Sequence, residues 1–242
     1  MDAGIFSAMS GSLAAQTRLD ALANNLANAN TSGFKAERVL QRAEPAGDIA
    51  PPPTAVKTPV TREHVLTDFS QGAVSQTGNP LDVALTGEGF FVVKTEQGER
   101  LTRSGSFTID SAGYLAASDG SRIQGTSGDI NIPRGPVVIG TDGSVRADEQ
   151  RVGQLRIVRV EDTAKLIRES GTRFAPAADA PPVDVAPSSV KVIQGATEAA
   201  NISPVEGLVQ LIETVRGFET YMRAAERLDQ ITSKAINDVG RV

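Results

Sequence analysis

The strongest constraint on the fold of this chain is a helical pattern in its last segment, residues 203–242. Ser203, Pro204 and Glu206 form a capping box with proline at the first helical position, which predicts that a helix begins there. Beyond it, with two polar interruptions, apolar residues follow alternating steps of three and four: Leu208, Leu211, Val215, Phe218, Met222, Ala225, Ile236 and Val239. At 1.5 Å per residue this helix would be roughly 55 Å long, which is long for a helix folded into a small domain.

Residues 1–34 predict a second helix at the other end of the chain. Its apolar residues also follow spacings of three and four: Ile5, Met9, Leu19, Ala23 and Leu26. Charged residues are rare before Lys35, so the helix lacks the charged outer face that is typical of a soluble domain. Gly33 is a candidate for the left-handed residue that ends it. Two terminal helices with apolar stripes to cover indicate packing against each other and against other copies of the chain.

Three asparagines, Asn24, Asn25 and Asn28, lie near the end of the first predicted helix. Asparagine is a poor helix former, because its amide competes for backbone hydrogen bonds. The pattern fits two interpretations equally well. One is a fraying, capped helix end, and the other is a polar ladder in which amides cross-link neighbouring subunits.

Between the helices, residues 78–190 have the features of a β domain. Short apolar segments alternate with glycine-containing turns, for example at residues 96–99 and 110–113. This predicts many short antiparallel strands in a sandwich or open barrel. Residues 35–77 are expected to form an extended linker and residues 191–202 a return linker. The predicted fold class is mixed, with a coiled-coil-like hairpin of terminal α-helices flanking a central all-β domain.

The composition excludes several kinds of catalytic and metal-binding chemistry. The chain has no cysteine and one histidine, so disulfides, thiol nucleophiles and multi-histidine metal sites are excluded. His64 lies in a polar stretch without the nucleophile and acid that a catalytic histidine needs. Residues 87–89 lack the third glycine of a nucleotide-binding motif. We therefore expect no catalytic residue, no metal and no cofactor.

The charge and hydropathy patterns also limit the kinds of binding partner that are expected. A net charge of −5 argues against nucleic-acid binding, which usually requires a basic face. No apolar run is long enough to cross a membrane, so membrane insertion is not expected. The N-terminus, MDAGIFSAMSGSLAAQ, lacks the basic and continuous apolar regions of a cleaved signal peptide.

Four motifs, in order along the chain, resemble those of the axial proteins of the bacterial flagellum, which include the rod and hook proteins. The N-terminal motif of that family resembles NNLAN followed by TSGFK, within residues 24–35. The start of its central domain resembles GNPLDVAL and GEGFF within residues 78–91, and the next hairpin resembles TRSGSF at 102–107. Its C-terminal motif resembles NISPVE at 201–206. The match spans nearly the whole chain.

This resemblance implies a non-enzymatic subunit that polymerises into the helical rod crossing the periplasm and transmits torque from motor to hook. It implies export by the flagellar type III apparatus without a cleaved signal peptide. The implied partners are other copies of the chain and other flagellar rod proteins. The short stretch after TSGFK favours the proximal-rod type. A distal-rod or hook-type subunit is the alternative, and a periplasmic β domain that binds a ligand such as peptidoglycan is a competing class.

The assembly hypothesis assigns roles to particular residues. Seam residues of the first helix are expected to pack on seam residues of the second: Ile5, Met9, Leu19 and Leu26 on Leu208, Leu211, Val215, Phe218 and Met222. The three asparagines and the Gly33-Phe34 turn are expected to set how this hairpin meets adjacent subunits. The β domain is expected to form an outer layer that adds lateral contacts.

Overall fold

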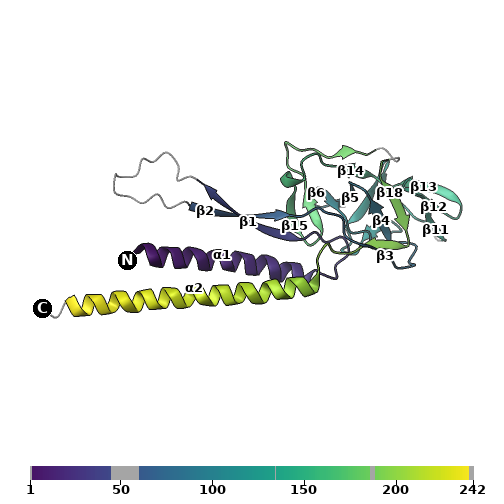
Figure 1. The fold of residues 1–242 in the computed structure, drawn as a ribbon. Coiled ribbons are helices and arrows are strands. Elements are labelled where there is room, and N and C mark those ends of the chain that lie inside the picture. The colour runs from purple at the N-terminus through teal and green to yellow at the C-terminus, as the bar shows by residue number, and fades with distance from the viewer. Residues whose placement is uncertain (1, 45–59, 134, 186–188, 240–242) are drawn as a thin grey trace. The chain divides into compact units, whose positions relative to one another are not determined.

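The computed structural model describes residues 2–44, 60–133, 135–185 and 189–239. They form two compact units, which are best followed by the chain colours in Figure 1. The helical unit comprises Met1–Ala27, Glu37–Asp68 and Ser203–Val242. The β unit comprises Asn28–Ala36 and Phe69–Ile202. The expectation of helices towards both ends, with antiparallel strands between them, is confirmed.

The helical unit contains α1, Asp2–Ala27, and α2, Pro204–Val239, which lie side by side (Figure 1). As predicted, α2 begins at Pro204, and the Ser203 hydroxyl accepts a hydrogen bond from the Glu206 amide at 3.4 Å. Glycines of α1 lie close to large side chains of α2. A Cβ atom on Gly11 would lie 2.6 Å from the Tyr221 ring, so the small residue permits the close approach.

Helix α1 ends at Ala27, before the predicted limit of residue 34. The chain turns instead, and the Thr31 amide donates to the Asn28 carbonyl at 2.9 Å. This turn uses backbone groups that would otherwise continue the helix. Asn28, Thr31 and Gly33 all favour such a turn over a helix.

Residues 35–77, which were expected to be a linker, contain strands. Strand β1, Glu37–Glu44, pairs antiparallel with β2, Val60–Thr67, and the two contact α1 within the helical unit. The proline-rich part of the expected linker, within 45–59, lies outside the described residues.

The β unit consists of short strands, all paired antiparallel where they pair. Their bounds are β3 Val74–Gln76, β4 Val83–Thr86, β5 Phe90–Thr95, β6 Gly98–Thr102, β7 Phe107–Ile109, β8 Leu115–Ala117, β9 Arg122–Gly125, β10 Gly128–Asp129, β11 Val137–Ile139, β12 Ser144–Ala147, β13 Gln150–Gln154, β14 Ile157–Arg159, β15 Ile167–Ser170, β16 Arg173–Ala175, β17 Val183–Asp184, β18 Lys191–Gln194 and β19 Ala196–Glu198. A short 3₁₀ helix, Thr163–Lys165, precedes β15.

The largest sheet has ten strands, with the central order β15-β16-β6-β5-β9-β8-β7. Strands β11, β12 and β13 form a separate sheet, while β18 pairs with β4 and β19 pairs with β3. The segment expected to be a return linker therefore supplies two of the paired strands. Its residues contact strands that lie more than a hundred positions earlier in the chain, which local sequence patterns do not reveal.

Strand β5 is buried on both faces, which explains its unbroken apolar run Phe90-Phe91-Val92-Val93. Phe91 and Val93 belong to one core cluster, whereas Phe90 and Val92 belong to a second on the other side. In the first cluster, the rings of Phe91 and Phe107 pack edge to face with centroids 5.1 Å apart. The centre of the β unit is therefore built around β5.

Phe91→Ala should reduce the free energy of unfolding of the β unit by about 3–5 kcal/mol, because it leaves a cavity beside Phe107. Urea denaturation of the full chain, followed by circular dichroism, measures this loss. Ile167→Ala is the matched control, since Ile167 is 61% exposed and its truncation should cost less than about 1 kcal/mol. Equal losses for the two variants would contradict the central position of Phe91.

Candidate assembly surface and buried anchor

Helix α2 carries two apolar stripes on different sides. The inner stripe consists of half-buried residues: Gly207, Leu211, Thr214, Phe218, Ala225 and Leu228. The close approaches of Gly4 to Leu228 and of Gly11 to Tyr221 lie on this side. The outer stripe consists of exposed residues: Val205, Leu208, Val209, Ile212, Val215 and Met222. Successive residues of a helix are rotated by about 100°, which separates the centres of the two stripes by roughly 130° and places Val215 and Met222 next to the inner stripe.

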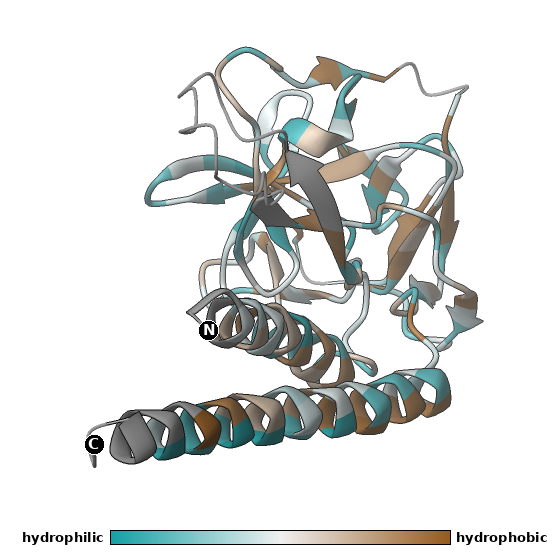
Figure 2. Ribbon diagram, turned by 60° about the vertical axis from the view of Figure 1, so that its left-hand side comes forward, coloured by the Kyte–Doolittle hydropathy of each residue, from teal (hydrophilic) through white to brown (hydrophobic). Residues whose placement is uncertain are grey.

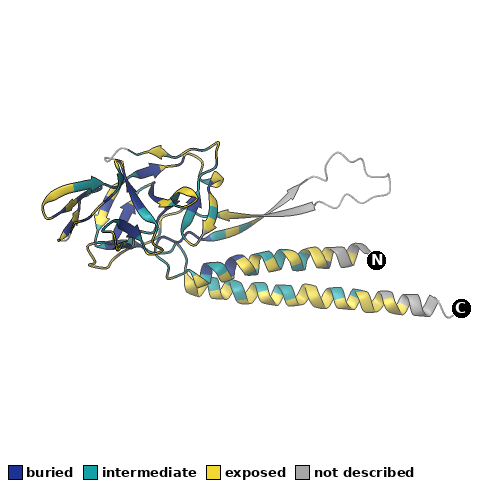
Figure 3. Ribbon diagram, turned by 180° about the vertical axis from the view of Figure 1, so that it is seen from behind, coloured by how far each residue is buried: buried dark blue, intermediate teal, exposed yellow. Residues whose placement is uncertain are grey.

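The outer stripe is the most distinctive surface of the helical unit. Val205 is 73% exposed and Ile212 is 53% exposed, although both are large aliphatic residues. Figure 3 shows α2 mainly in the colour of exposed residues, and Figure 2 shows hydrophobic segments along it. A contiguous apolar surface of this kind marks a protein–protein contact in soluble proteins.

The predicted seam residues of α2 are divided between these stripes. Leu211 and Phe218 lie on the inner stripe, whereas Leu208, Val215 and Met222 lie on the outer stripe. The sequence pattern groups all five in one seam, because adjacent apolar pairs such as Leu211 and Ile212 hide the second stripe.

On α1, Leu19 and Leu26 are half-buried, but Met9 is 58% exposed. Leu13, which the seam pattern omitted, is also exposed, at 66%. Ile5 lies in α1, and its side chain is outside the described part of the structure. The apolar residues that α1 buries are instead small or lie at other positions: Ala8, Ala21 and Leu22.

Asn25 makes its hydrogen bonds inside the chain. Its side-chain amide donates to the Glu37 carbonyl at 2.8 Å and accepts from the Glu37 amide at 2.8 Å. The side chain is 8% exposed and fixes the point where β1 begins beside α1. Asn24 and Asn28 are half-buried, and the Asn28 side chain accepts from the Thr31 hydroxyl at 3.2 Å. Both interpretations of the asparagines omitted this use of Asn25.

The Gly33-Phe34 turn lies inside the β unit. Residues 28–36, which we call the strap, pack against β-unit residues, and Phe34 is 1% exposed. The guanidinium carbon of Arg168 lies 4.7 Å from the centroid of the Phe34 ring, and that group also donates to the Lys35 carbonyl. Gly33 has φ +70°, and a Cβ there would lie 2.2 Å from the Ser104 amide nitrogen.

A buried ion-pair network holds the strap. The Lys35 ammonium donates to Glu198 Oε1 at 2.6 Å and to the Ser70 carbonyl at 2.7 Å. Arg103 donates to Glu198 Oε2 at 3.3 Å and to the Gly87 carbonyl at 2.5 Å. Burial lowers the pKa of Arg103, and the nearby Glu198 carboxylate opposes that shift. We call the side chains of Lys35, Arg103 and Glu198 the anchor. None of them was predicted from the sequence to be a functional residue.

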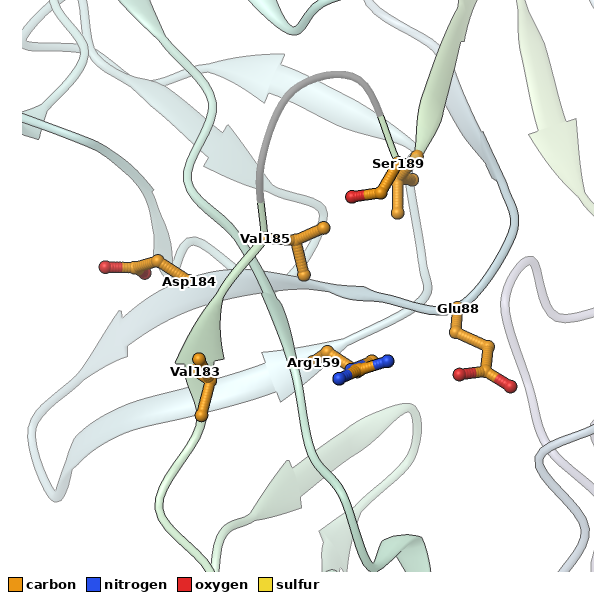
Figure 4. Close-up of a pocket in the computed structure, with 7 residues that line it drawn as sticks. Glu88, Arg159, Val183, Asp184, Val185 and Ser189 are labelled. Carbon is orange, nitrogen blue, oxygen red and sulfur yellow. The ribbon is translucent and has the colours of Figure 1, made fainter.

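The described residues offer little for catalysis. A hollow on the β unit is lined by Glu88, Arg159, Asp184 and Ser189, among others (Figure 4). The Asp184 carboxylate accepts from Arg156 at 2.8 Å, and in Figure 4 it points away from Ser189. Within the described ranges, no three potential metal-ligating side chains gather in one place. His64 lies exposed on β2.

Among the described residues, no helix is both long and apolar enough to cross a membrane.

Three family profiles match successive parts of the chain. Residues 5–35 match the flagella basal body rod protein family, and residues 84–147 match the D1 domain of the flagellar hook protein FlgE/F/G. Residues 193–238 match the C-terminal part of the flagellar basal body rod FlgEFG protein. The matches include most of α1, of the strap and of α2, and part of the β unit. They define an axial structural protein of the flagellum, which agrees with the resemblance found in the sequence.

Relatives of full length narrow the assignment. The flagellar basal-body rod protein FlgF of Caulobacter vibrioides is 33% identical over 100% of both chains. FlgF of Salmonella typhimurium is 30% identical over 97% of both chains, and FlgG of Bacillus subtilis is 29% identical over 96% of this chain and 97% of its own. The chain therefore belongs to the flagellar basal-body rod proteins, and it is most like FlgF. Membership of this family makes it a structural protein and not an enzyme, as the sequence analysis expected.

Asn25→Ala should destabilise the helical unit by about 1–3 kcal/mol, because it leaves the Glu37 amide and carbonyl without their side-chain partner. Hydrogen exchange measured at the Glu37 amide should accelerate. Asn30→Ala, at an exposed position, is the control and should leave this exchange rate unchanged. Unaltered exchange at Glu37 in the Asn25 variant would show that the amide does not hold β1.

Gly33→Ala should destabilise the β unit more than a positive φ alone explains. Gly120→Ala is the matched control, because Gly120 has φ +86° but open space around its Cβ position. The control should lose about 1–2 kcal/mol, the cost of the left-handed backbone. Gly33→Ala should lose clearly more in urea denaturation, since its Cβ meets the backbone at Ser104. A loss no greater than that of the control would contradict the close packing of the strap.

Proposed function

We propose that this chain is a subunit of the flagellar basal-body rod that self-assembles, together with other rod proteins, through its terminal helices. The assembled rod would be the drive shaft that transmits torque from motor to hook. The observation that carries this proposal is the outer stripe of α2, which remains exposed although the inner stripe is covered. Family membership supports it independently.

The two terminal helices would act as a coiled-coil-like hairpin whose inner stripe forms within one subunit. The outer stripe would then contact a different surface of the next subunit. A contact between two unlike surfaces that does not close into a ring produces a filament. The β domain, within residues 78–190, would form the outer layer and add lateral contacts.

The free energies of burial and of association favour several neighbours for each subunit. A fully buried side chain of this type contributes about 1.5–3 kcal/mol, and the six residues of the outer stripe are partly covered already. Burying the remainder would contribute roughly 5–9 kcal/mol. Association costs an estimated 4–15 kcal/mol in lost freedom, so one such contact is marginal. A helical rod provides each subunit with several contacts at once.

The proposed location is the periplasmic rod of the basal body, reached by export through the flagellar type III apparatus without a cleaved signal peptide. The absence of cysteine in the sequence suits this route, because no disulfide forms in the oxidising periplasm. The proposed partners are other copies of the chain, other rod proteins and, in transit, the export apparatus. A place in the distal rod or hook is the alternative.

Leu208→Asp combined with Ile212→Asp should abolish motility, because two charges would interrupt the outer stripe while leaving the inner stripe intact. The variant chain should be absent from isolated basal bodies but should retain the circular dichroism of the folded protein. Thr220→Asp, at an exposed polar position of the same helix, is the control and should support normal swimming. Normal motility of the double variant would overturn the proposal.

Phe218→Asp tests the inner stripe separately. It should weaken the pairing of α2 with α1, and so lower helicity and prevent assembly together, while the β unit stays folded. Basal bodies that contain this variant at normal amounts would contradict a role for the helical hairpin. Detection of the unaltered chain only beyond the proximal rod would instead favour the distal-rod or hook alternative.

A further inference from the structure

The last strands of the β unit complete structure that begins far earlier in the chain. Strand β18 pairs with β4, and β19 pairs with β3. Val190 and Val192, which are 3% and 1% exposed, belong to the same core cluster as Phe91. Ala196 is fully buried. The core around β5 is therefore incomplete until residues 190–198 join it.

Glu198 connects three separate parts of the β unit. Its carboxylate accepts from Lys35 of the strap and from Arg103, which follows β6, and its Oε1 also accepts from the Gly72 amide at 3.0 Å. Its main-chain carbonyl accepts from the Gly33 amide at 2.7 Å. Lys35 lies 163 positions before Glu198 in the sequence, and Arg103 lies 95 positions before it.

The buried charges make the β unit unstable until Glu198 has joined it. The side chains of Lys35 and Arg103 are 1% and 5% exposed, and that of Glu198 is fully buried. If the unit closed without Glu198, Lys35 and Arg103 would be buried without the carboxylate that accepts hydrogen bonds from both of them, although the Glu88 carboxylate would still act on Arg103. Burying a charge without its partner is strongly unfavourable, whereas an unfolded chain keeps both cations in water.

We propose that Glu198 is the closing residue of the β unit, so that the unit folds only after the chain has been delivered through residue 198. A chain that emerges with its N-terminus first, from a ribosome or from a channel, then remains open until nearly the whole β unit is present. The inference concerns folding of the β unit, and it holds or fails independently of the proposed role in the rod.

The competing possibility is stepwise folding. Strands β5 and β6 are adjacent in sequence and joined by a tight turn, so local contacts alone could form them first. The anchor predicts instead that β5 becomes stable only when β18 and β19 have joined the unit. Protection of β5 against hydrogen exchange should then appear together with protection of β18, in a single phase.

Pulse-labelled hydrogen exchange during refolding of the full-length chain tests this order. In the unaltered protein, the amides of β5 and β18 should gain protection at the same rate. Glu198→Gln keeps the size of the side chain but removes its charge, and it should lower protection in β5 at least 100-fold. Glu99→Gln is the matched control, since Glu99 pairs with Arg156 at the surface, and it should change protection less than threefold.

A second variant separates the charge effect from general misfolding. Adding Lys35→Met to Glu198→Gln removes one of the two cations that Glu198 normally neutralises. It should raise the protection of β5 at least tenfold above that of Glu198→Gln alone. Three results would overturn the proposal: protection of β5 clearly before β18 in the unaltered chain, loss confined to β19 in Glu198→Gln, or no recovery in the double variant.

Discussion

The ion pair between Lys35 and Glu198 is the interaction on which the β unit depends. It joins the strap, near the start of the chain, to the last strand of the unit, and neither side chain has access to water. Such a pair contributes little net stability compared with apolar packing, but removing either member is costly because the other is left buried. The ion pair therefore makes the folding of the β unit all-or-none, since the unit is stable only when both distant segments are in place.

The helical unit follows a different principle. Its helices cover one stripe of α2 and leave another exposed, so its apolar surface exceeds what one chain can bury. The β unit has satisfied its core internally, with Phe91 and its neighbours fully enclosed. One protein thus combines a unit that is finished within the chain with a unit that is unfinished by itself. This division suits a subunit that folds one unit by itself and completes the apolar contacts of the other unit with its neighbours.

Local chemistry made much of the fold predictable. The start of α2 follows from Ser203 and Pro204, because capping involves residues that are adjacent in sequence. The hairpin turn predicted at residues 96–99 follows from adjacent residues in the same way, and it joins β5 to β6. The ribbon of β1 and β2 escaped prediction, since Val39 and Leu40 are adjacent rather than alternating and their partners lie beyond the intervening segment.

The candidate site was predicted only in part. The terminal helices were recognised, but adjacent apolar residues of α2 belong to different stripes, a distinction that depends on where α1 lies. The Gly33-Phe34 turn was expected to set how the hairpin meets adjacent subunits, and within the single chain Phe34 is enclosed by the β unit. Lys35 stood within a motif recognised in the sequence, yet its role depends on Glu198, and no pattern of spacing connects residues so far apart.

The strap also determines how the chain would respond to mechanical tension. The Ala36 amide donates to the Asn201 side chain at 2.7 Å, and Gly33 bonds to the carbonyl of Glu198. The outgoing and returning segments are thus tied directly to each other. A pull applied through either helix reaches these ties first, so the force is shared between the two segments before it strains the hydrophobic interior.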